Sequence, residues 1–153
     1  MNIFVLTTGR SGSTTFFEAC RHIKNYTSAH ESQVGSIGKS RLSYPKNHIE
    51  IDNRLSWFLG RLDKVYGDDA IYVHLRRNHE KIASSFVKRW DFDGGIIRAY
   101  RQGILQGLPT WVDSYLCCLD YCDTVDSNIE SFLKDKSYIY NKFLFREWKR
   151  RIS

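Results

Sequence analysis

The alternation of apolar and polar positions predicts a chain in which short strands are followed by helices. Residues 3–6 (IFVL) and 70–75 (AIYVHL) are apolar runs of strand-forming residues that are too short for helices. Weaker strand patterns lie at residues 26–29, 48–51 and 137–140. Strands that alternate with helices form parallel sheets covered on both faces. We therefore expect an α/β fold, a three-layer sandwich with a mainly parallel sheet of about 4–5 strands.

Apolar residues at helical spacing place helices between and after these strands. The expected helices cover residues 13–20, a segment from a cap at Asp52 or Asn53 to a stop at Gly67, and residues 82–87, 96–106 and 110–133. The polar segment 33–47 contains two glycines and a proline, which predicts an exposed, mobile loop long enough to act as a lid. No repeat or second domain is visible, so residues 1–153 form one predicted domain.

Length, charge and cysteine usage indicate an ordinary globular protein. The chain has 153 residues, enough to bury roughly two-thirds of its unfolded surface. Its formal net charge of +6 favours anionic ligands but does not by itself indicate nucleic acid. We expect a cytoplasmic protein without a membrane span, because no apolar run approaches ~20 residues and no basic leader precedes the first one. The cysteines lack zinc spacing and are expected to be reduced and buried: Cys20, Cys117, Cys118 and Cys122.

A loop rich in glycine and hydroxyl groups follows the first strand, at residues 7–14 (TTGRSGST). Glycines, backbone amides and the start of the next helix together form an anion site. The loop is not a nucleoside-triphosphate P-loop, because Thr7 stands at the first glycine of that motif and Ser13 at its lysine. Arg10, the only cation in the loop, suits a phosphate or sulfate group. The alternative is a Gly/Ser turn without a ligand.

A second group of cationic residues, Arg76 and Arg77, follows the second strong strand. We call this group and the loop that contains Arg10 the two cationic corners. In parallel sheets, ligands bind beyond the carboxyl ends of the strands, where both corners are expected to lie. Two corners on one edge indicate a ligand with two separated anionic groups.

The two motifs together resemble those of sulfotransferases that use 3′-phosphoadenosine 5′-phosphosulfate (PAPS). TTGRSGSTT resembles their 5′-phosphosulfate loop, and YVHLRRNHEKIASSF resembles their 3′-phosphate-binding strand, loop and helix. The resemblance covers roughly residues 2–90 and implies a P-loop-like nucleotide-binding topology. It implies adenosine 3′,5′-bisphosphate as the product, with no metal. It also implies donor-binding roles for the following residues: Gly9, Arg10, Ser11, Gly12, Ser13 and Thr14 at the 5′ end, and Arg77 and Ser85 at the 3′-phosphate.

The resemblance also implies a base that takes the proton of the acceptor hydroxyl or amine. Glu31, after the second predicted strand, is the first candidate, and His30 is the alternative because other branches use histidine. Asp52 is a third carboxylate, but helix capping accounts for it. Arg10 would assist catalysis at the leaving group.

The chain also departs from the family. Thr15 stands where many members have an aromatic residue beside the adenine, and no C-terminal nucleotide loop is recognisable. We therefore expect a short or C-terminally truncated member. The sequence does not show whether the acceptor is a small molecule, a carbohydrate or a peptide. It does not show the oligomeric state.

Three other interpretations remain open at this point. The chain could be a non-catalytic nucleotide-binding or anion-binding module derived from this fold. The basic, aromatic segment 143–152, together with Lys142 and the preceding Tyr138 and Tyr140, could bind nucleic acid, although a solvated basic face is the more common case. Four aromatic residues could line an acceptor pocket, although core positions are favoured for them: Trp90, Phe92, Tyr100 and Trp111.

Overall fold

Five parallel strands form one sheet in the order β2-β3-β1-β4-β5. The computed structural model describes residues 1–109, 111–136 and 139–143, the last of these by their backbone. The strands are β1 Asn2–Leu6, β2 Thr27–His30, β3 His48–Ile51, β4 Ala70–Leu75 and β5 Ile139–Phe143. The expected α/β class and parallel sheet are confirmed. The first residues of the strand expected at 137–140 lie outside the described part of the chain.

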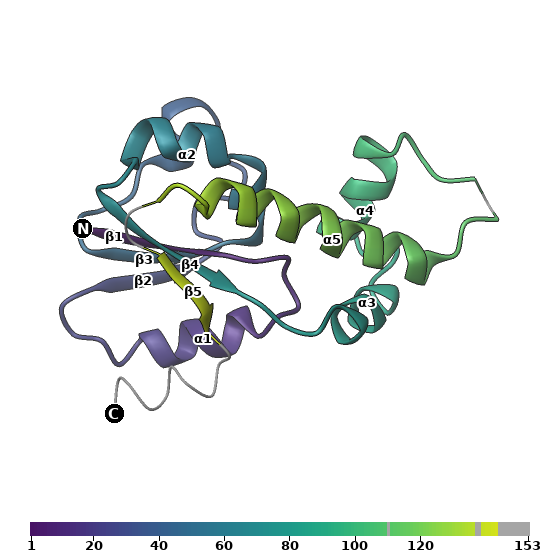
Figure 1. Cartoon of the computed structure of the whole chain (residues 1–153), viewed down its shortest axis with the longest axis horizontal. Helices are drawn as coiled ribbons and strands as arrows, with labels where there is room; N and C mark the ends of the chain where they lie inside the picture. The colour runs from purple at the N-terminus through teal and green to yellow at the C-terminus, as the bar shows by residue number, and fades with distance from the viewer. Residues whose placement is uncertain (110, 137–138, 144–153) are drawn as a thin grey trace.

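The sheet is covered on both faces, which agrees with a three-layer arrangement (Figure 1). Successive residues of β1 point to opposite faces: Phe4 and Leu6 join one apolar cluster and Val5 joins the other. Helix α1, Ser13–Cys20, buries Phe16 and Cys20 against the face that carries Val5. Helices α2, Leu59–Tyr66, and α5, Ser114–Leu133, contribute to the cluster on the other face.

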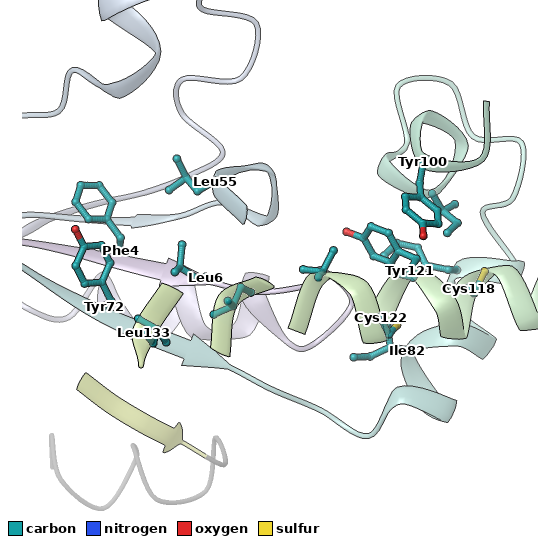
Figure 2. Close-up of a cluster of buried hydrophobic side chains, with 14 of the residues drawn as sticks. Phe4, Leu6, Leu55, Tyr72, Ile82, Tyr100, Cys118, Tyr121, Cys122 and Leu133 are labelled. Carbon is teal, nitrogen blue, oxygen red and sulfur yellow. The ribbon is translucent and has the colours of Figure 1, made fainter. Parts of the chain in front are cut away.

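The long helix α5 connects the sheet to a smaller helical group. Helix α3, His79–Val87, packs against α5, and α4, Ile96–Ala99, continues into the π-helical turn η3, Tyr100–Ile104. Tyr121 of α5 is fully buried between these groups, and its ring makes edge contacts with Phe86 and Tyr100 (Figure 2). Aromatic pairs of this kind hold α3 and the η3 turn at fixed positions beside the end of β1.

Residues 33–47 are mostly exposed, as expected, but part of the segment is folded against the core. They contain the 3₁₀ helix η1, Gly38–Leu42, in which Arg41 and Leu42 are buried. Arg41 makes an ion pair of 2.6 Å with Asp52, so a buried charge pair anchors the segment. This attachment fixes the middle of the segment, and the lid predicted from its length and glycine content stays a prediction.

The other helix boundaries depart from expectation in smaller ways. The helix expected after Asp52 is divided into the 3₁₀ helix η2, Asn53–Trp57, and α2. Asp52 does act as a cap, since its carboxylate accepts a 2.7 Å hydrogen bond from the Arg54 amide. The helix expected from residue 110 begins at Ser114, where the Asp113 side chain caps it. Across the described residues, no helix combines the length and apolar character needed to cross a membrane.

All four cysteines are buried free thiols, as expected. Burial raises the pKa of Cys20, Cys118 and Cys122 to about 12. These groups therefore stay protonated near neutral pH and serve as small core residues rather than nucleophiles.

Candidate functional site

The glycine-rich loop between β1 and α1 has a backbone that only particular residues tolerate. Gly9 has a φ of +83°, and a Cβ atom there would lie 2.7 Å from Asn53 Nδ2. Gly12 has a φ of +98°, and a Cβ there would meet no atom within 4 Å. Arg10 also lies in the left-handed region, with φ 55°. Gly9 is therefore required by packing, whereas Gly12 leaves open space above the start of α1.

Buried hydrogen bonds hold this loop from beneath. The hydroxyls of Thr7 and Ser11 are hydrogen-bonded to each other, and the Gly9 amide donates to Thr7 Oγ1 at 3.2 Å. Tyr121 of α5 donates from its hydroxyl to the Thr8 carbonyl at 2.7 Å. The Ser11 hydroxyl thus faces the interior, so the side chains of the loop that reach a shared cavity are those of Arg10, Ser13 and Thr14.

The two cationic corners predicted from the sequence are in direct contact. Arg10 Nε donates to Ser85 Oγ at 2.8 Å, and Arg77 Nη1 donates to the Arg10 carbonyl at 2.9 Å. The helix α3 that carries Ser85 begins just after the end of β4, and Asn78 caps it by accepting from the Lys81 amide at 3.0 Å. Residues 75 positions apart in the chain therefore form one surface.

Positive charge is concentrated at this junction. Partial burial, followed by the nearby charges of Arg89 and Arg77, lowers the pKa of Arg10. Within the described residues, none of these three arginines makes an ion pair with a carboxylate. Guanidinium groups that lie close together without a compensating carboxylate indicate a site for an anionic ligand.

A cavity of about 300 Å³ opens beside Arg10 and contains both candidate bases. His30, at the end of β2, has its Nε2 3.2 Å from Ser13 Oγ, and its ring centroid lies 6.1 Å from that of Phe17. Glu31 follows with a φ of 54°, and its amide donates to the Ile51 carbonyl at 2.9 Å. The turn after β2 therefore presents both side chains to the cavity that starts at the glycine-rich loop.

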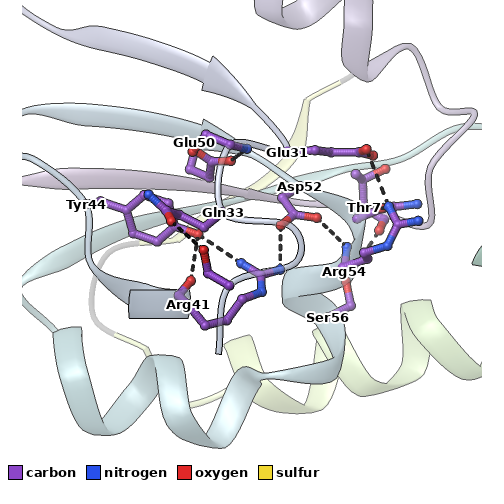
Figure 3. A network of polar contacts seen from close by, with 12 residues as sticks. Thr7, Glu31, Gln33, Arg41, Tyr44, Glu50, Asp52, Arg54 and Ser56 are labelled. Carbon is purple, nitrogen blue, oxygen red and sulfur yellow. Dashed lines mark hydrogen bonds and ion pairs between the residues drawn. The ribbon is translucent and has the colours of Figure 1, made fainter. Parts of the chain in front are cut away.

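Arg54 is a part of this cavity that the sequence did not reveal. Its Nη1 lies 3.4 Å from Glu31 Oε2, and its Nη2 donates to the Gly94 carbonyl at 2.7 Å. Its own amide is held by Asp52, which in turn pairs with the buried Arg41 (Figure 3). A chain of polar contacts thus runs from the hydrophobic core to Glu31. No local sequence pattern predicts this chain of contacts, because its residues come from three separate segments.

Two more cavity residues, Arg89 and Phe92, lie beyond the end of α3. The guanidinium of Arg89 lies over the Phe92 ring, 5.2 Å from its centroid. Phe92 is 56% exposed and lines the cavity, so the expectation that it belongs to the core is wrong. The same expectation is wrong for Trp111, which is 83% exposed, and correct for Tyr100, which is buried. Trp90 is partly buried and packs against the core.

A more open groove of about 560 Å³ continues from the other side of the Arg77 corner. It is lined by Arg77, Glu80, Lys81, Ser84, Ser85, Lys88 and Tyr115. Three of these residues are cationic and one is anionic, so the groove extends the positive surface along α3.

A buried polar network fixes the end of β4 and the start of α3, just beneath Arg77. Asp126 of α5 lies 2.9 Å from His74 Nε2 and 2.7 Å from His79 Nε2. Burial alone would raise the pKa of Asp126, but hydrogen bonds from the two histidines outweigh it and the pKa is lowered. For His79 burial acts to lower the pKa, and bonds to Asp126 and Asp123 raise it overall. The strand end that carries Arg77 is therefore attached to α5.

Comparison with known proteins adds no identification. No family model, no curated protein and no solved structure matches the chain. In the part of the chain that the structure describes, no group of three or more His, Cys, Asp or Glu side chains is placed to hold a metal ion.

Proposed function

We propose that this protein is a sulfotransferase that transfers a sulfuryl group from PAPS to a hydroxyl or amine acceptor. The observation that carries the proposal is the contact between the two corners: Arg10 bonded to Ser85, with Arg77 on the Arg10 carbonyl. A ligand with a 5′-phosphosulfate and a 3′-phosphate on one ribose needs two anion sites side by side. The strand order β2-β3-β1-β4-β5, with the loop after the central strand, supports a P-loop-like topology.

The residues at the first corner fit the 5′ end of such a nucleotide. The empty space at Gly12 allows an anion to approach the backbone amides at the start of α1. Ser13 and Thr14 supply hydroxyl groups on the same side, and Arg10 supplies a guanidinium. Because this guanidinium lies next to the leaving phosphate in the proposed complex, it stabilises the charge that develops there during transfer.

The residues at the second corner fit the 3′-phosphate. Arg77 has a guanidinium that can bind phosphate through two parallel hydrogen bonds. Ser85 Oγ accepts its hydrogen bond from Arg10, so the hydroxyl hydrogen remains able to donate to a phosphate oxygen. The exposed Lys81 and Lys88 extend positive charge along the adjoining groove.

Glu31 is the proposed base and His30 the alternative. PAPS, when bound, supplies the sulfuryl group and the leaving bisphosphate. The acceptor oxygen forms a bond to sulfur while the bond from sulfur to the 5′-phosphate oxygen breaks, and the electron pair stays on the phosphate. The acceptor proton moves to a Glu31 carboxylate oxygen, which Arg54 holds at the cavity wall. His30 lines the same cavity, and histidine is the side chain that most often acts as a general base.

Release of adenosine 3′,5′-bisphosphate from PAPS, measured with a panel of hydroxyl and amine acceptors, tests the proposed reaction. Glu31→Gln should lower kcat by roughly a hundredfold or more, as expected for loss of a general base. Glu18→Gln, an exposed substitution on α1, is the matched control and should leave the rate unchanged. A large loss in His30→Gln but not in Glu31→Gln would reassign the base. Nucleotide binding without turnover for any acceptor would instead support the non-catalytic module.

A further inference from the structure

The cavity holds more positive charge than the donor requires. Arg10 and Arg77 serve the two phosphates of the proposed donor, yet the cavity beside Arg10 also contains the guanidinium groups of Arg54 and Arg89. Glu31 is the only carboxylate among the described residues that line it. We propose that the acceptor is itself an anion, a small hydroxylated carboxylic acid whose carboxylate binds Arg54 and Arg89. This inference rests on the proposed function and extends it to the class of acceptor.

Arg54 is held in place independently of Glu31. Its Nη2 donates to the Gly94 carbonyl at 2.7 Å, and its amide donates to Asp52, which is fully buried and paired with Arg41. Its contact with Glu31 is long for an ion pair, at 3.4 Å. A guanidinium has five N–H donors, so Arg54 retains donors for a second anion in the cavity.

Arg89 approaches the same cavity from the end of α3. Among the described residues, the only direct contact recorded for its guanidinium is with the ring of Phe92, 5.2 Å from the centroid. An arginine that lies on an aromatic ring keeps its N–H edge available for a carboxylate. Phe92 and the buried Phe86 both line the cavity and present apolar surface to the body of an acceptor.

Proton transfer gives a reason for an acceptor anion at this position. When Glu31 takes the acceptor proton, its carboxylate becomes neutral, and the Arg54 guanidinium loses the only carboxylate recorded beside it among the described residues. A carboxylate on the acceptor restores that balance, because it stays ionised throughout the transfer. It also directs the acceptor so that its hydroxyl group faces Glu31 and the sulfuryl position.

Binding of matched acid and amide probes tests the inference. The protein is first saturated with adenosine 3′,5′-bisphosphate, and calorimetric titration follows with 4-hydroxybenzoate or 4-hydroxybenzamide, and with D-glucuronate or D-glucuronamide. We expect the acid of at least one pair to bind about tenfold more tightly than its amide, the effect of one charge-assisted contact. Arg54→Gln and Arg89→Gln should each remove most of that preference. Arg61→Gln, the same change on α2 outside the cavity, should preserve it.

The outcomes separate this inference from the proposed function. Failure of the bisphosphate itself to bind would contradict the proposed function. If the bisphosphate binds but neither acid is preferred, including the case in which no probe binds, the anionic acceptor is excluded and the sulfotransferase proposal stands. A preference for the acid that persists in both arginine variants would also overturn the inference, because the acid would then be recognised elsewhere.

Discussion

Arg10 and Ser85 are hydrogen-bonded to each other at 2.8 Å, although one follows the first strand and the other lies on a helix 75 residues later. This contact joins the two anion corners at the carboxyl edge of the sheet. The neighbouring Ser84 on the same helix provides a matched control for Ser85. Among the described residues, the hydroxyl of Ser84 bonds only to the Glu80 carbonyl.

Ser85→Ala should weaken binding of adenosine 3′,5′-bisphosphate by about tenfold, through loss of one hydrogen bond to a charged group. Ser84→Ala is the matched control and should bind within about twofold of the wild type, since its hydroxyl bonds to the helix backbone. Titration calorimetry measures both. Equal affinity of the two variants would show that Ser85 does not contact the nucleotide.

Gly9→Ala should destabilise the protein by about 1–3 kcal/mol, because it combines a strained backbone with a steric clash. The added Cβ would lie 2.7 Å from Asn53 Nδ2 at a φ of +83°. Gly60→Ala in α2 is the control, since a Cβ there meets nothing within 4 Å. It should stabilise by about 0.5–1 kcal/mol as alanine replaces glycine in a helix. Urea unfolding compares the two, and a neutral Gly9→Ala would argue against this loop geometry.

The location of the two corners was predictable because each directly follows an apolar strand. β1, β3 and β4 lie where the hydrophobic pattern places them, and α1 begins at Ser13 as expected. A loop after a parallel strand must reach the same edge of the sheet, so short-range information was enough to position Arg10 and Arg77.

The remainder of the site depends on contacts that no local pattern records. Arg54 reaches Glu31 only because Asp52 and the buried Arg41 fix the turn after β3. A glycine-containing polar segment predicts an exposed loop, and residues 33–47 are mostly exposed, but the pattern does not record the ion pair that buries Arg41. Phe92 was assigned to the core from its residue type, yet it lies at the cavity because the chain turns there at Gly94 and Gly95.

Arg41→Met should destabilise the protein by about 3–5 kcal/mol, since it leaves the buried carboxylate of Asp52 without its counter-ion. The exposed fractions of the two side chains are 3% and 0%. Adding Asp52→Asn to this variant should recover part of the loss, because an amide costs less to bury than an unpaired charge. Urea unfolding at neutral pH measures both. A double variant less stable than Arg41→Met would contradict the interpretation of this pair.

The network of Asp126 and His79 should give the protein a stability optimum in mildly acidic solution. The raised pKa of His79 contributes stability that is complete below its ordinary value of 6.5 and is lost as the pH rises through the raised value. The lowered pKa of Asp126 contributes stability that is present above its ordinary value of 3.8 and is lost as the pH falls through the lowered value.

His79→Gln should therefore reduce the decline in unfolding free energy as the pH rises above about 6.5, where the histidine loses its proton. Urea unfolding at several pH values measures that slope. His22→Gln, a change at an exposed site just after α1, is the control and should leave the slope as in the wild type. An unchanged slope in His79→Gln would show that this histidine does not carry the pH dependence.

The most direct test of the account is the thermal shift produced by adenosine 3′,5′-bisphosphate. At a concentration of about 100 Kd, we expect a stabilisation of about 2.7 kcal/mol and a rise in Tm of roughly 5–10 °C. Arg77→Ala should lower the affinity roughly ten- to hundredfold and remove about half of the shift or more, whereas Arg21→Ala, at the far end of α1 from the loop, should retain it. No shift at millimolar nucleotide, or an equal shift in Arg77→Ala, would contradict the two-corner site.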